Sequence, residues 1–61
     1  MNMDKEIEKL ELHVVRLEQA IRQVQRLRQM GLDNEKIDRK IDEYLDGILE
    51  AKKRIEELKK K

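Results

Sequence analysis

The sequence predicts an all-α fold: an antiparallel helical hairpin of the coiled-coil type, two copies of which form a four-helix bundle. Three observations predict it: apolar residues spaced three and four positions apart, a glycine between the two periodic stretches, and the small size of the chain. With 61 residues the chain has room for one domain. We expect a single hairpin over residues 1–61, with helices at about 4–30 and 34–60 and a turn at 31–33.

The apolar residues of both stretches follow the heptad repeat of a coiled coil, in which core positions alternate three and four residues apart. The repeat continues for about three heptads on each side of the glycine, and a single matching heptad would mean little. The predicted hairpin core consists of Ile7, Leu10, Val14, Leu17, Ile21, Val24, Ile37, Ile41, Tyr44, Ile48, Ala51, Ile55 and Leu58.

The predicted turn consists of Leu27, Gly31, Leu32 and Asp33. Gly31 can adopt the left-handed conformation that ends a helix, and Leu27 and Leu32 then form the hydrophobic pair of a Schellman motif. Asp33 is a suitable N-cap for the second helix. Leu32 would also pack against Ile37 as a hydrophobic staple, so one leucine serves both helix ends.

The register that this turn sets places every core residue opposite another core residue, as in the pairs Val24–Ile41, Leu17–Ile48 and Leu10–Ile55. Each helix is acidic in its first half and basic in its second half, which suits the helix dipole. Antiparallel packing therefore also sets acidic halves beside basic halves.

A two-helix seam covers its core residues on one side only, and a chain this small without cysteines needs oligomerisation for stability. Read from the register, one flank is polar, with Glu11 facing Arg54, Gln25 facing Lys40 and Glu18 facing Gly47, and the other is partly apolar, with Ala20 facing Leu45. The predicted oligomer interface on the apolar flank consists of His13, Ala20, Leu27, Met30, Leu45 and Leu49. A homodimer is favoured, while a tetramer or a complex with another protein would cover the same residues, and two hairpins can dock parallel or antiparallel.

Composition narrows the classes of function. Cysteine is absent and His13 is the only histidine, so we expect no metal site and no cofactor. The net charge of +1 gives no general attraction to nucleic acid or to an anionic membrane. No apolar run approaches the ~20 residues of a membrane span, and residues 1–6 lack the apolar region of a secretory signal. We therefore expect a cytoplasmic protein without a membrane segment.

Three further groups of residues could carry function, and each has a simpler structural interpretation. His13 could be a pH-sensitive contact, but a partly buried packing role is the favoured interpretation. Asp38, Asp42 and Asp46 share a helix face that could bind a divalent cation, and pairing with arginines of the first helix is favoured instead. Leu12 and Val15 are either scattered surface residues or a second contact patch.

The basic clusters could contact phosphates, although stacking aromatics are missing and acids alternate with the bases. They consist of Arg16, Arg22, Arg26 and Arg28 in the first half of the chain, and of Lys52, Lys53, Arg54 and Lys59 to Lys61 in the second.

In length and layout the chain resembles the Rop family of plasmid-encoded hairpins, which dimerise into four-helix bundles that bind RNA. The hairpin also resembles, more distantly, the small sporulation-regulating aspartyl-phosphate phosphatases, but Asp38-Arg39-Lys40-Ile41-Asp42 stands where their Ser-Gln-x-Leu-Asp signature would be. We therefore expect a non-enzymatic, self-associating module for protein–protein interaction: an adaptor, a small regulator or an oligomerisation unit. The alternative is a Rop-like bundle that binds structured RNA, and minor alternatives are a phosphatase-like regulator or a designed coiled-coil protein.

Overall fold

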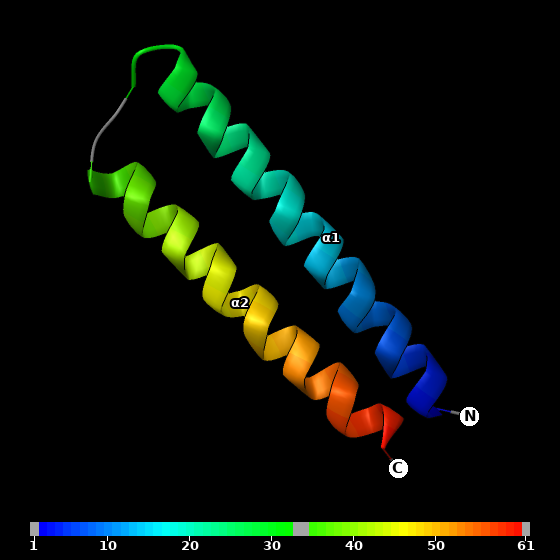
Figure 1. Ribbon diagram of the computed structural model, residues 1–61. Coiled ribbons are helices and arrows are strands. Elements are labelled where there is room, and N and C mark those ends of the chain that lie inside the picture. Colours follow the sequence, from blue (N-terminus) through cyan, green and yellow to red (C-terminus); the bar gives the residue numbers. More distant parts are fainter. Residues whose placement is uncertain (1, 33–34, 61) are drawn as a thin grey trace.

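The computed structural model describes residues 2–32 and 35–60 and is an all-helical hairpin, as the sequence predicts. Helix α1 spans Asn2–Gln29 and helix α2 spans Glu35–Lys59. The two helices pack along their whole length, with Cα extents of 47 × 14 × 11 Å. Figure 1 shows that the start of α1 and the end of α2 lie together at the end of the molecule opposite the turn.

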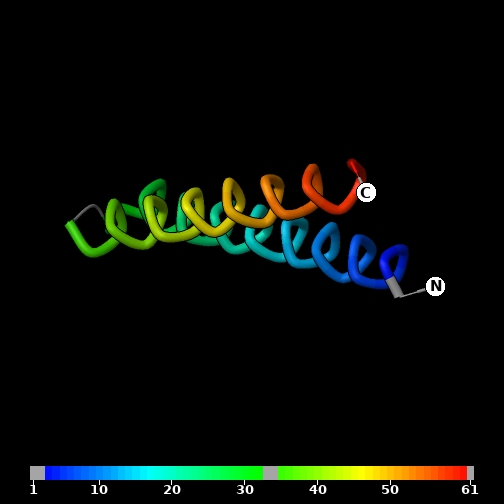
Figure 2. Tube along the Cα trace, turned by 90° about the horizontal axis from the view of Figure 1, so that it is seen from below, coloured from blue at the N-terminus to red at the C-terminus, as the bar shows by residue number. Residues whose placement is uncertain are grey.

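The helices wind past each other instead of running strictly side by side, which is apparent when the two views are compared (Figure 2). A heptad repeat produces this geometry because its 3.5-residue spacing drifts slowly around a 3.6-residue helix. Both helices carry acids in the first turn and bases in the last, namely Asp4 with Arg26 and Arg28 in α1, and Glu35 and Asp38 with Lys59 in α2. These charges oppose the helix dipole at each end.

The turn begins with a Schellman motif. Gly31 has a φ of 98°, which is the left-handed conformation that glycine adopts without strain. Its N–H donates to the carbonyl of Arg28, and the N–H of Leu32 donates to the carbonyl of Leu27, both over 3.0 Å. These are the two hydrogen bonds that define the motif, and they satisfy the carbonyls of Leu27 and Arg28 in the last turn of α1. Asp33, the expected N-cap, lies outside the described residues.

Most of the buried side chains lie between the middle of the seam and the termini. Val14, Ile48 and Ala51 form one cluster, against which Leu10, Leu17 and Ile21 pack. The buried members of the predicted core are Val14, Ile37, Ile48, Ala51, Ile55 and Leu58. The other predicted core residues are half-buried: Ile7, Leu10, Leu17, Ile21, Val24, Ile41 and Tyr44.

The sequence predicted Gly47 on the polar flank, but the structure places it against the seam. A Cβ atom added to Gly47 would lie 3.0 Å from Cδ1 of Leu17, so the leucine occupies the space that the glycine leaves. The prediction that Gly47 faces Glu18 is therefore wrong. Within the described part of the chain, neither helix has the length and apolar character needed to cross a membrane.

Candidate interaction surfaces

The seam between α1 and α2 leaves a flank on either side, and the contacts show which residues share each flank. Arg54 lies 3.5 Å from Glu6 in an ion pair. Glu11 and Lys52 line a shallow hollow of about 310 Å³ together with the core residues Val14 and Ile55. The structure therefore pairs Arg54 with Glu6, whereas the sequence analysis paired it with Glu11.

The difference has a geometric cause. Two antiparallel helices are read in opposite directions along a common axis, so equivalent heptad positions of the two helices meet on the same flank. The register gives only the height of each residue along the axis and carries no information about the flank. The sequence-based assignment joined unlike flank positions, and its pairing of Ala20 with Leu45 likewise joins unlike heptad positions.

The predicted interface residues consequently divide between the two flanks. Leu27 lines a groove with Lys40, and Ala20 and His13 precede Leu27 by one and two heptads on the same side of α1. Leu45 precedes Lys52 by one heptad and so lies on the flank of Glu11, and Leu49 is one turn further along α2. Met30, at the end of α1, is 77% exposed.

The first surface, which we call the aliphatic ridge, consists of Leu12, Val15, Leu45 and Leu49. Val15 is one turn after Glu11 and so lies on the flank that carries Leu45, and Leu12, one turn before Val15, lies further round α1 at the outer edge of this flank. All four side chains are exposed, Leu49 to 66%. Exposed apolar residues from both helices thus contribute to one surface.

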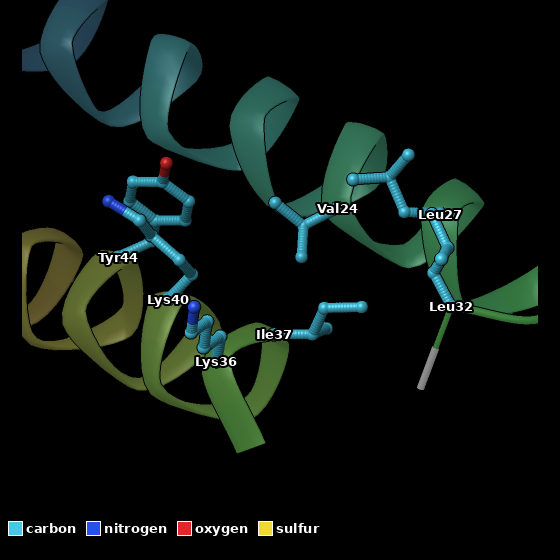
Figure 3. A pocket seen from close by; sticks show the side chains of 7 residues that line it. All are labelled: Val24, Leu27, Leu32, Lys36, Ile37, Lys40 and Tyr44. Carbon is cyan, nitrogen blue, oxygen red and sulfur yellow. The ribbon is translucent and has the colours of Figure 1, made fainter. Parts of the chain in front are cut away.

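The second surface, on the opposite flank beside the turn, is a hollow of about 320 Å³ that we call the lysine groove (Figure 3). Its walls are the aliphatic side chains of Val24, Leu27, Leu32 and Ile37, and Lys36, Lys40 and Tyr44 complete the lining. Figure 3 shows that α1 and α2 contribute opposite walls and that Leu32 closes the end near the turn. The groove thus combines an apolar floor with two ammonium groups.

The groove is not predicted from the sequence, although several of its residues are. Leu27 and Leu32 are predicted as turn residues, Leu27 also as an interface residue and Ile37 as a core residue, but the pattern does not bring them together in one groove. Lys36 and Lys40 lie one helical turn apart and are both exposed, which was the available signal for a basic rim.

Two further candidates from the sequence are the acidic face of α2 and His13. Asp38 forms an ion pair with Arg28, as the favoured interpretation of the acidic face predicts, whereas among the described residues Asp42 and Asp46 have no such pair. His13 is exposed, and in the part of the chain that the structure describes no three His, Cys, Asp or Glu residues come together as metal ligands.

Comparisons of the chain with protein-family models, with curated proteins and with solved structures found no match. The ridge and the groove are therefore the features of this chain that bear on its function.

Proposed function

We propose that this chain is a non-enzymatic interaction module whose hairpins associate with one another, so that the helices of two copies form a four-helix bundle. The observation that supports the proposal is the exposed apolar surface. The large apolar side chains with exposures between 41% and 77% are Met3, Leu12, Val15, Leu27, Met30, Leu32, Leu45 and Leu49.

The core of a single hairpin is correspondingly thin. None of the described side chains is completely buried, and the best-covered residue, Leu58, keeps 4% of its surface exposed. A chain of this size buries only about 60% of the surface that its unfolded form exposes, which leaves little net stability. Covering the ridge or the groove with another hairpin would add about 25 cal/mol for every Å² of apolar surface removed from water.

Sedimentation equilibrium tests this proposal. At micromolar concentration we expect an average mass well above the 7.4 kDa of one chain, together with a helical circular dichroism spectrum. A fully helical chain that stays monomeric up to millimolar concentration would overturn the proposal.

A variant identifies the apolar surface as the cause of association. Leu45→Lys together with Leu49→Lys should lower the average mass towards one chain while helicity at high protein concentration is retained, since both side chains are exposed. The matched control, Gln19→Lys, adds a charge at an exposed position outside the ridge and the groove and should leave the mass unchanged. The RNA-binding alternative predicts instead a salt-sensitive gel shift with structured RNA.

A further inference from the structure

The lysine groove and the aliphatic ridge lie on opposite flanks of the hairpin and complement each other in shape and charge. We infer that the ridge of one copy docks into the groove of a second copy. This inference rests on the proposed self-association and specifies the two surfaces that meet. It places a four-helix contact between each two neighbouring copies, without closing the assembly as a pair. It makes the contact a head-to-tail one between unlike surfaces.

Shape is the first argument. Leu45 and Leu49 are one helical turn apart on a helix face and protrude into solvent with 46% and 66% exposure. The groove offers a hollow of about 320 Å³ with aliphatic walls from both helices. Successive leucines on one helix face that fill a groove between two other helices are a common mode of helix recognition.

Charge is the second argument. Lys36 and Lys40 are one turn apart in the lining of the groove. Asp42 and Asp46 are also one turn apart, and each precedes a ridge leucine by three residues on the same side of α2. Within the described part of the chain neither aspartate has an ion pair, unlike Asp38. Docking would bring two free carboxylates to two ammonium groups.

Other pairings are less well matched. Two grooves facing each other would bring the lysines of both copies together around a hollow that neither copy fills. Two ridges facing each other would leave both grooves open to water. Ridge-to-groove docking covers both kinds of exposed apolar surface with one contact.

Because the two surfaces lie on opposite flanks, one contact between two copies leaves one ridge and one groove unused. A head-to-tail contact of this type closes only as a ring and otherwise continues as a chain of subunits. The average mass should therefore keep rising with concentration beyond that of a pair.

Charge reversal tests the inference directly. The groove variant carries Lys36→Glu and Lys40→Glu, and the ridge variant carries Asp42→Lys and Asp46→Lys. In each variant the ridge and the groove have charges of the same sign, so at low ionic strength we expect self-association to weaken by about tenfold or more. When the two variants are mixed, each groove meets a ridge of opposite charge, and association should return to the wild-type level.

Controls use the same charge changes elsewhere. Lys53→Glu with Lys60→Glu matches the groove variant, and Glu50→Lys with Glu57→Lys matches the ridge variant, all at exposed positions outside both surfaces. These controls should associate as the wild type does. High salt should reduce the differences between all variants because it screens exposed charges.

Two results would separate the inference from the proposed function. If the wild type associates but the groove variant associates equally well and mixing restores nothing, the ridge-to-groove contact is refuted and self-association stands. If the wild type itself remains monomeric, both are refuted. A concentration series that stops at a stable pair would likewise contradict the head-to-tail contact.

Discussion

The half of the hairpin towards the termini and the half towards the turn follow the same heptad repeat, but the side chains of the first half are buried more deeply. Between the middle of the seam and the termini, Val14, Ile48 and Ala51 pack in one cluster, and Ile55 and Leu58 are also buried. Nearer the turn, Ile37 is buried, while Val24, Ile41 and Tyr44 are half-buried beside the lysine groove.

The difference arises from single residues in the seam. Ala51 is small and adds little bulk between the helices, whereas the corresponding position one heptad earlier is the ring of Tyr44. Arg28 follows Ile21 by one heptad, so the last seam position of α1 holds a charged side chain that pairs with Asp38. The comparison teaches that a repeat fixes which residues face the partner helix, while their size and charge decide whether the seam closes.

The largest expected effect is the loss of core volume in the cluster of Val14, Ile48 and Ala51. Ile48→Ala should destabilise the hairpin by about 2–5 kcal/mol, because the removed atoms leave a cavity in the closed cluster. Ile41→Ala, in the half-buried part of the seam, should cost roughly 1 kcal/mol, since much of that side chain already meets solvent.

Urea unfolding followed by circular dichroism measures both changes, at equal protein concentration because association adds to apparent stability. Ile48→Val, which removes one methylene group, is the conservative control and should cost about 0.5–1.5 kcal/mol. Equal losses for the two alanine variants would show that the half near the turn is as well packed as the other.

The next effect concerns the two glycines. Gly31→Ala should cost about 1–2 kcal/mol because an L-residue is strained at a φ of 98°. Gly47→Ala is the matched control: alanine improves helix propensity by about 1 kcal/mol. The new Cβ would also press on Cδ1 of Leu17, which can shift because it is the end of a flexible side chain.

Thermal unfolding of both variants checks this prediction, and Gly31→Ala should have the lower Tm. If Gly47→Ala is the more damaging change, the contact with Leu17 is tighter than the flexibility of a leucine allows, and the centre of the seam limits stability more than the turn does.

The smallest effect is that of two ion pairs between described residues, one in each half. Asp38→Asn removes the carboxylate that pairs with Arg28, and Glu6→Gln removes the carboxylate that pairs with Arg54. Both pairs are largely exposed, so each change should cost less than about 1 kcal/mol. Both losses should shrink in 1 M salt, where the screening length is only about 3 Å. A salt-independent loss for Asp38→Asn would show that Arg28 has a structural role in the seam beyond this pair.

The sequence was sufficient to predict the helical hairpin, because periodicity and a turn glycine are local signals. It was not sufficient to predict the depth of burial: Leu17 and Ile48 are opposite core residues in the predicted register, yet Ile48 is buried and Leu17 is half-buried. The flanks were predicted wrongly because a count along the axis contains no handedness. The lysine groove was missed since it needs Leu27 and Lys40 from different helices on one side of the molecule.

The start of α1 and the end of α2 lie at the same end of the hairpin, and this has a mechanical consequence (Figure 1). A force that pulls the two ends apart acts across the seam and not along it. The helices would then separate one core layer at a time, beginning at Leu58 and Ile7 and reaching the turn last. Each layer resists by itself, so the hairpin would yield to a small force, and the cluster of Val14, Ile48 and Ala51 would bear the load only after the outer layers have separated.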